Sequence, residues 1–189
     1  IECTVIDKRT PSTGSSSAST ALLQYEIDVP LYKMADMIGE EKALLAYQCC
    51  LQSITDIERV FEGVGVNPDF DRVSSLFYAS NKNGAGIIEK EYEIRKKYGL
   101  PTILLSAKDI KTTYGFEAPA GLLNDASAQI DAYMAATILL DYQMAEHGLT
   151  FFTHSAIMEW NKNGSEYELL SDKGYKIKCK YVIIAAGFE

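Results

Sequence analysis

The segment that decides the fold lies near the start of the chain, where Cys3-Thr4-Val5-Ile6-Asp7-Lys8-Arg9 is followed by Gly14-Ser15-Ser16-Ser17-Ala18-Ser19-Thr20-Ala21-Leu22-Leu23-Gln24. Residues 1–6 are apolar and β-branched, which is typical of a short buried strand. Asp7 ends this strand, at the place where a nucleotide-binding βαβ unit carries a carboxylate that binds a ribose hydroxyl. An acid that merely ends a strand is the alternative reading of Asp7 alone.

The serine-rich run after the strand has two interpretations. Its composition is that of a flexible linker. Small hydroxyl side chains and accessible backbone N–H groups can also surround an anionic pyrophosphate. This segment alone leaves both interpretations open.

The middle of the chain predicts alternating helices and strands. A helix over 40–62 is indicated by one apolar stripe and by the stop signals Gly63 and Gly65. The stripe consists of Ala43, Tyr47, Cys50, Ile54, Ile57 and Phe61. Segment 21–29 is ambiguous between strand and helix, and Pro30 can begin a short helix. We further expect strands at 72–79, 102–106 and 120–124, and helices at 86–98 and 108–114.

The end of the chain predicts a helix followed by a meander. Asp131 is a suitable N-cap for a helix that ends at His147, and the apolar middle of this helix predicts burial on more than one face. We then expect a strand at 149–153, a hairpin of 155–160 and 165–170 around Asn161-Lys162-Asn163-Gly164, and an exposed strand at 175–179. The run from Tyr181 to Ala186 predicts a strand covered on both faces, ending in Ala185-Ala186-Gly187.

Taken together in this order, the strand with its acid, the serine run, the helix, the meander and the final Ala-Ala-Gly resemble the D-amino-acid oxidase and glycine oxidase family of FAD-dependent oxidoreductases. The resemblance covers nearly the whole chain and is sharpest at 2–28, 131–160 and 181–187. It implies an α/β fold: part of a Rossmann-like FAD-binding domain with an antiparallel β-meander, plus part of a mixed-sheet substrate domain.

The resemblance also implies which residues bind FAD. Asp7 matches the acid that holds the adenosine ribose, and Lys8 and Arg9 follow it along the cofactor. The loop that meets the pyrophosphate is matched by Ser15, Ser16, Ser17 and Ser19. The isoalloxazine is passed by Leu22, Leu23 and Gln24. Ile157 matches the residue whose backbone meets adenine, and Ala185, Ala186 and Gly187 border the dinucleotide.

The resemblance further implies that the chain is an internal fragment. The glycine-rich fingerprint of the family would lie about 20 residues before Asp7, outside this chain. Residues 1–28 and 131–189 would form part of the FAD domain, and residues 29–130 the substrate-domain portion. We expect the isolated fragment to be apo and inactive, and to self-associate through an exposed sheet edge. The departure from the more common Ala-Thr-Gly at 185–187 puts that match in doubt.

For the parent protein, the resemblance implies oxidation of a C–N bond of a small amine or amino acid by hydride transfer to FAD. No catalytic residue is identifiable in this chain. Two alternatives are a non-enzymatic binding or regulatory domain of the same fold and a nicotinamide-nucleotide domain that uses Gly84-Ala85-Gly86 with Asp109. Glu89 counts against the nicotinamide reading, because it occupies the third glycine position of the fingerprint.

Composition sets the remaining bounds. The 189 residues are 47% hydrophobic and carry a net charge of −8, which disfavours nucleic-acid partners because their phosphates require Lys and Arg. We see no transmembrane segment, no secretory signal and no metal-ligand spacing. The four cysteines form no Cys-x-x-Cys pair, so we expect reduced thiols and a cytoplasmic location.

Overall fold

A computed structural model describes residues 2–186; the predicted site residue Gly187 lies outside this range. The chain divides into two compact units, one formed by Ile1–Ser19 with Ala136–Glu189 and the other by Thr20–Ala135. We call them the outer unit and the central unit, after their places in the sequence. The predicted α/β class is confirmed, with both parallel and antiparallel strand pairs.

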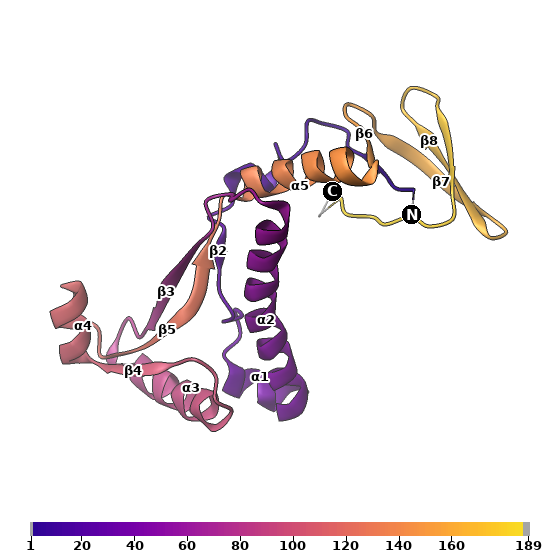
Figure 1. Cartoon of the computed structure of the whole chain (residues 1–189). Helices are drawn as coiled ribbons and strands as arrows, with labels where there is room; N and C mark the ends of the chain where they lie inside the picture. The colour runs from indigo at the N-terminus through magenta and orange to yellow at the C-terminus, as the bar shows by residue number, and fades with distance from the viewer. Residues whose placement is uncertain (1, 187–189) are drawn as a thin grey trace. The chain divides into compact units, whose positions relative to one another are not determined.

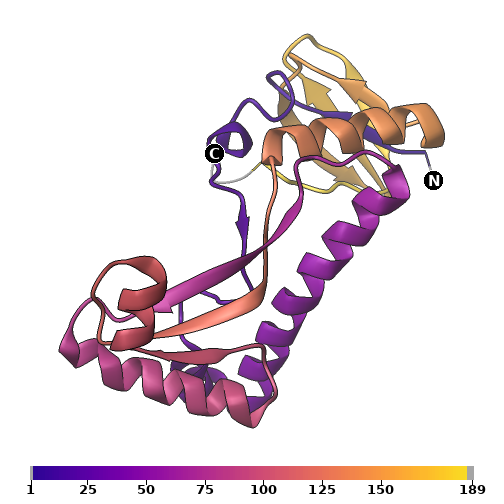
Figure 2. The same cartoon turned by 60° about the vertical axis from the view of Figure 1, so that its left-hand side comes forward.

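The sheet of the central unit is built around one long strand, β5. It pairs antiparallel with β3 along one edge and with β2 and β4 along the other. Figures 1 and 2 show β5 between β3 and β4. The bounds are β2 Leu22–Leu23, β3 Asp71–Tyr78, β4 Ile103–Ser106 and β5 Ala120–Gln129. The ambiguous segment 21–29 thus contains a two-residue strand, and β5 extends five residues beyond the predicted 120–124.

The predicted helices of the central unit are confirmed. Their bounds are α1 Leu31–Ile38, α2 Glu40–Val64, α3 Ala85–Lys97 and α4 Ala107–Tyr114, with a short 3₁₀ turn η2 at Lys82–Gly84. The short helix expected at Pro30 is present, but Pro30 is its N-cap and the first helical residue is Leu31. The helix α2 ends at Gly65, whose φ of 78° is a conformation that glycine adopts without strain.

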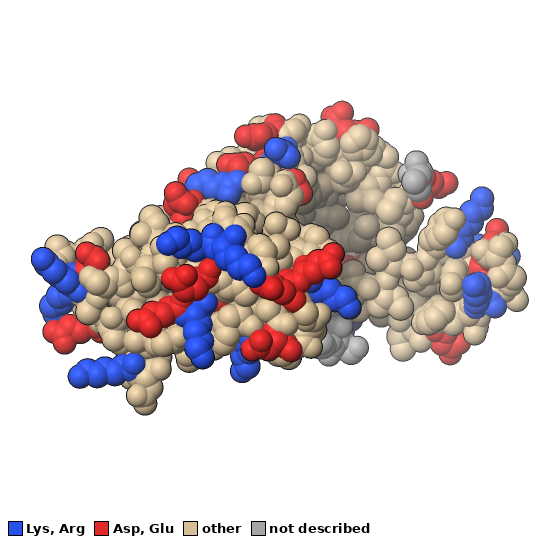
Figure 3. Space-filling model, turned by 90° about the horizontal axis from the view of Figure 1, so that it is seen from below, with Lys and Arg blue, Asp and Glu red and all other residues tan. Residues whose placement is uncertain are grey.

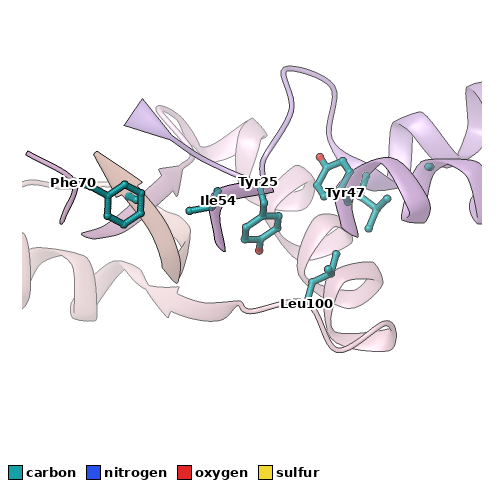
Figure 4. Close-up of a cluster of buried hydrophobic side chains, with 8 residues drawn as sticks. Tyr25, Tyr47, Ile54, Phe70 and Leu100 are labelled. Atoms are coloured by element: carbon teal, nitrogen blue, oxygen red, sulfur yellow. The ribbon is translucent and has the colours of Figure 1, made fainter. Parts of the chain in front are cut away.

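The apolar stripe of α2 faces the main core. Four of its six predicted positions are buried, namely Ala43, Tyr47, Ile54 and Phe61, while Cys50 and Ile57 are half-buried. Figure 4 shows Tyr47 and Ile54 together with Tyr25, Phe70 and Leu100 in the same cluster. These side chains come from α2, from the segment after β2 and from loops beside the sheet, so the core joins the helices to the sheet.

The outer unit contains a parallel strand pair and a meander. β1 pairs parallel with β6, with Thr4 opposite Thr150 and Ile6 opposite Phe152. β7, β8 and β9 form the predicted antiparallel meander. The bounds are β1 Thr4–Ile6, the 3₁₀ turn η1 Ser15–Ala18, β6 Thr150–Phe152, β7 Ile157–Asn163, β8 Glu166–Ser171 and β9 Lys176–Cys179.

Two details of the outer unit differ from expectation. β1 is half-buried rather than buried, with Val5 and Ile6 partly exposed, because one neighbouring strand covers it only on one edge. The hairpin turn lies later than predicted, since Asn163 is still paired with Glu166 and the loop is Gly164-Ser165. Gly164 has a φ of 63°, the left-handed conformation that such a tight turn requires.

Helix α5 (Ala132–His147) begins and ends as predicted but is not buried as predicted. The Oδ1 atom of Asp131 accepts a hydrogen bond from the backbone N–H of Met134 at 2.8 Å, which is an N-cap interaction. None of the residues of α5 is fully buried, and its apolar middle, 134–140, is half-buried all round. The expectation of burial on more than one face is therefore wrong for this chain.

The expected strand at 181–186 is also wrong. The segment has no regular secondary structure, and Tyr181 and Ile183 are 86% and 91% exposed. A strand buried on both faces exists only through its neighbours, which supply hydrogen bonds and cover its side chains. Residues 181–186 pair with none of the described strands, so an apolar β-branched composition alone does not form the strand.

Candidate functional site

Asp7 follows the end of β1, and its backbone is fixed on both sides. Its N–H donates to the carbonyl of Phe152 at 2.9 Å, and its carbonyl accepts from the N–H of Ser155 at 3.0 Å. The half-buried side chain points forward along the chain, since Oδ1 accepts from the N–H of Arg9, two residues later, at 2.7 Å. The carboxylate is thus held at the end of a parallel strand, in the position expected of a ribose-binding acid.

Arg9 brings a positive charge beside the serine run. A Cβ atom added to Gly14 would lie only 3.2 Å from Nη2 of Arg9. The guanidinium therefore uses space that glycine leaves open. Lys8 and Arg9 are both exposed, and the carbonyl of Arg9 accepts from the N–H of His154 at 3.4 Å.

The serine run is an ordered turn. Ser15, Ser16 and Ser17 lie in η1, and the hydroxyl of Ser17 donates to the carbonyl of Gly14 at 2.9 Å. The N–H of Ser19 donates to the carbonyl of Ser16 at 3.4 Å. All four serines are exposed, and Gly14, which immediately precedes them, is the residue that the Arg9 guanidinium approaches.

The remaining predicted residues lie in different places. Leu22 and Leu23 form β2 of the central unit and pair with Gln129 and Ala128. Leu22 and Gln24 are exposed, and Leu23 is half-buried against the core. Within the outer unit, Ile157 begins β7 opposite Ser171, and Ala185 and Ala186 are exposed outside any strand.

The loop Gly84-Ala85-Gly86 does not form a dinucleotide fingerprint. It joins η2 to α3, after a strand whose one described partner, β5, is antiparallel, whereas the fingerprint belongs to a parallel βαβ unit. Gly84 packs closely, since a Cβ there would lie 3.1 Å from that of Ala79. Asp109 is engaged in a capping box with Ser106 at the start of α4.

A buried polar cluster in the central unit was missed by the sequence analysis. We call it the Arg95 cluster; it consists of Tyr25, Glu26, Tyr47, Glu91, Arg95 and Asn124. Arg95 and Glu91 are 1% and 0% exposed and are joined by a 2.7 Å ion pair across one helical turn. Their i, i+4 spacing is visible in the sequence, but a charged helix is usually solvated, so the pattern at 86–98 gives no sign of burial.

Burial governs the ionisation of this cluster. Burial raises the pKa of Tyr25 to about 12 and also raises that of Tyr47, so both phenols stay neutral. Burial by itself would lower the pKa of Arg95, but Tyr25, Glu91 and Glu26 together raise it above the ordinary value. Arg95 therefore remains charged. By contrast, Figure 3 shows exposed acidic and basic side chains interspersed over the face seen there.

The surface of the central unit also carries an open groove of about 610 Å³ beside α1 and α3. It is lined by Tyr32, Glu89, Lys90, Glu93, Ile94 and Lys97. None of the predicted site residues lines this groove. No group of three or more potential metal-ligating side chains occurs within residues 2–186, and no helix in that range is long and apolar enough to cross a bilayer.

Comparison with known proteins identifies the class. The family model described as FAD dependent oxidoreductase matches residues 1–189, so the chain belongs to this family. FAD is accordingly the cofactor of this family. No curated protein sequence matches the chain.

Solved structures share the fold at low identity. Glycine oxidase from Geobacillus kaustophilus matches with a TM-score of 0.78 and 19% identity, covering 97% of this chain and 48% of that one. L-Amino acid deaminase from Proteus myxofaciens matches with a TM-score of 0.78, 13% identity and coverage of 100% and 40%. FAD-bound L-α-glycerophosphate oxidase from Mycoplasma pneumoniae matches with a TM-score of 0.70, 15% identity and coverage of 89% and 43%. The chain thus spans about half the length of these proteins or less, and it has the α/β fold of FAD-binding relatives.

Proposed function

We propose that the whole protein oxidises a C–N bond of a small amine or amino acid. The neutral amine of its substrate loses a hydride from carbon while the nitrogen lone pair forms the C=N bond of an iminium ion. The iminium nitrogen loses a proton to water, and water then hydrolyses the imine to a carbonyl compound and ammonia or an amine. The flavin, when bound, accepts the hydride. The support is family membership together with similar structures named glycine oxidase and L-amino acid deaminase.

The observation that carries the cofactor site is the approach of Arg9 to Gly14. A guanidinium next to Gly14, at the start of a run of exposed serines, is chemically suited to a pyrophosphate, which takes charge-assisted hydrogen bonds. Because a Cβ at position 14 would crowd the guanidinium, the glycine fits this role. We therefore propose that Arg9, Lys8 and the serines Ser15, Ser16, Ser17 and Ser19 hold the pyrophosphate.

Other parts of the cofactor are assigned by the same proposal. Asp7 would accept a hydrogen bond from the ribose, as its place after β1 suggests. Adenine would meet the backbone of Ile157, and Ala185, Ala186 and Gly187 would border the dinucleotide. The exposed residues Leu22 and Gln24, with Leu23 between them, would pass the isoalloxazine ring.

We also propose which segments of the chain bind the cofactor and which belong to the substrate side. Residues 1–28 and 131–189 would serve the cofactor, and residues 29–130 the substrate side. The compact units divide at different positions, after Ser19, nine residues before the first proposed boundary, and before Ala136, five residues beyond the second. The parallel pair β1 and β6 has one described partner for each strand, and we propose self-association of the isolated chain along such an edge. The four cysteines are free thiols, in keeping with the proposed cytoplasmic location.

The decisive experiment uses the whole protein. We expect it to purify yellow with a flavin absorbance spectrum, and to release ammonia when turned over with glycine or another primary amino acid, or an amine with an acyclic secondary amino acid. Glycerol phosphate serves as a substrate without nitrogen. A folded but colourless protein would favour a non-enzymatic binding module, and reduction of the flavin by glycerol phosphate alone would refute C–N oxidation.

The 189-residue chain provides a second test. We expect it to bind FAD weakly or not at all, and to sediment as more than a monomer. Tight stoichiometric FAD in the purified chain would contradict the first expectation. A strictly monomeric chain at all concentrations would contradict the second.

A further inference from the structure

The segment Leu22–Gln24 presents alternate side chains outward. Leu22 is 55% exposed and Gln24 is exposed, while Leu23 and Tyr25 face the core. β2 contributes only two paired residues, and one more hydrogen bond joins the N–H of Ile130 to the carbonyl of Ala21 at 3.3 Å. So short a strand holds its position weakly by itself. The residues that follow this strand and are held more firmly therefore contribute to the position of the outward side chains.

Tyr25 and Glu26, directly after this segment, are held by Arg95. Nη1 of Arg95 donates to the hydroxyl of Tyr25 at 3.3 Å and to Oε1 of Glu26 at 3.0 Å. The Tyr25 hydroxyl in turn donates to the carbonyl of Pro101 at 2.5 Å. Oε1 of Glu26 also accepts from the side-chain amide of Asn124 on β5. Glu26 is thus tied to both a helix and the central strand of the sheet.

Arg95 is itself fixed in place. Its Nε donates to Glu91 at 2.7 Å, and its guanidinium lies over the rings of Tyr25 and Tyr47 at 5.4 and 5.8 Å from their centroids. The carboxylate of Glu91 accepts from the backbone N–H groups of Leu31 and Tyr32 at 3.0 and 3.1 Å. Arg95 therefore has little freedom to move, which suits it to hold another group at a fixed place.

The charges of the cluster do not balance. One guanidinium faces two carboxylates, and Oε2 of Glu26 is buried without a hydrogen-bond partner among the described residues. A buried carboxylate oxygen without a donor reduces stability. The Oε1 atom of Glu26, which accepts from both Arg95 and Asn124, is therefore the part of this carboxylate that links the chain after β2 to α3 and β5.

We propose that Glu26 is a positioning residue for the segment Leu22–Gln24. Through Arg95 and Asn124 it fixes the chain just after β2, and so sets the position at which Leu22 and Gln24 are presented to the flavin ring. This inference rests on the proposed function, in which those two side chains pass the isoalloxazine.

The first experiment measures hydrogen exchange in the whole protein after its flavin has been removed. Glu26→Leu deletes both hydrogen bonds, and Glu26→Gln keeps an acceptor at Oε1. We expect amides of residues 20–27 to exchange about tenfold faster in Glu26→Leu, with Glu26→Gln intermediate. Exchange at Leu31 and Tyr32 should stay slow, because Glu91 holds those amides. Unchanged exchange at 20–27 in both variants overturns the inference.

The second experiment uses the flavin-bound protein. We expect Glu26→Leu to shift the visible flavin absorption bands and to lower kcat with a smaller change in KM, and Glu26→Gln to restore part of both. The matched control is Glu40→Gln, which breaks the exposed ion pair with Lys97 and should change neither. If Glu26→Leu fails to fold, Glu26→Gln alone decides between these outcomes.

The two experiments separate the inference from the proposed function. Faster exchange at 20–27 with an unaltered flavin spectrum and kcat means that Glu26 fixes a segment that does not serve the flavin, and it overturns the inference. A wild-type protein that holds no flavin refutes the proposed function and, with it, the role of Glu26 toward the flavin. In that case, exchange in the flavin-free protein still decides whether Glu26 fixes residues 22–24.

Discussion

Replacing Arg95 with methionine tests the energetics of the Arg95 cluster. Arg95 is 1% exposed and is the cation that the described ion pairs bring to both Glu26 and Glu91. The substitution Arg95→Met keeps an unbranched apolar side chain but leaves the buried carboxylate of Glu91 and the half-buried carboxylate of Glu26 without a cation. Removing one partner of a buried ion pair costs about 3–5 kcal/mol. Because folded domains are stable by about 5–15 kcal/mol, we expect a large fall in the urea midpoint, measured by circular dichroism.

Two further variants define the result that would refute this reasoning. Lys97→Met breaks the exposed pair with Glu40 and should leave the midpoint almost unchanged. The double variant Arg95→Met with Glu26→Gln removes one of the stranded charges and should recover part of the loss. If Arg95→Met unfolds at the same urea concentration as Lys97→Met, the buried charges are not paired as the structure shows.

Three other predictions concern packing, pH and the cofactor. Gly121→Ala places a Cβ 3.0 Å from a leucine methyl of β3 and 3.2 Å from an isoleucine Cδ1 on α4, so it should lower the free energy of unfolding by about 1–3 kcal/mol. Gly63→Ala has open space around it in α2 and should raise the free energy of unfolding by about 0.5–1 kcal/mol. Thermal unfolding of the two variants distinguishes these effects. The pKa of Asp109 is lowered by hydrogen bonds from the side chain and the backbone of Ser106, the N-cap of α4. The stabilisation of the folded state by Asp109 is therefore complete above the unfolded pKa of about 4, and it is lost as the pH falls through the lower folded pKa. Asp109→Asn should abolish that dependence in unfolding curves between about pH 2 and 5. Arg9→Gln in the whole protein should weaken FAD binding about tenfold or more in a titration of the flavin-free form, with Lys42→Gln on α2 as an unchanged control.

The regular elements could be predicted because local residues determine them. Helix α2 follows from a stripe of apolar residues that is plain in the sequence, and its end follows from Gly65. Asp131 and Gly148 mark the limits of α5 in the same way. These signals act within a few residues of the chain, so no knowledge of distant segments is needed.

Burial could not be predicted in the same way, because it depends on partners. The apolar run at 181–186 has the composition of an interior strand, yet Ile183 is 91% exposed because none of the described strands pairs with the run. The length of β5 was underestimated for a related reason. Asn124 and Ser127 are polar residues that are not typical of a buried strand. The side-chain amide of Asn124 is satisfied by hydrogen bonds to Glu26 and Ser75, which are far away in sequence.

The candidate site shows the same division between local and distant information. The acid after β1 and the serine run could be recognised from their order along the chain, and the structure then adds the approach of Arg9 to Gly14, which only a folded turn can create. The Arg95 cluster lay beyond sequence reasoning, because Glu26 and Arg95 are 69 residues apart and a charged helix ordinarily faces water. Yet Glu26 comes only two residues after Gln24. Glu26 and the side chains predicted to face the flavin are therefore close together in the chain. A substitution of Glu26 should change the position of Leu22 and Gln24.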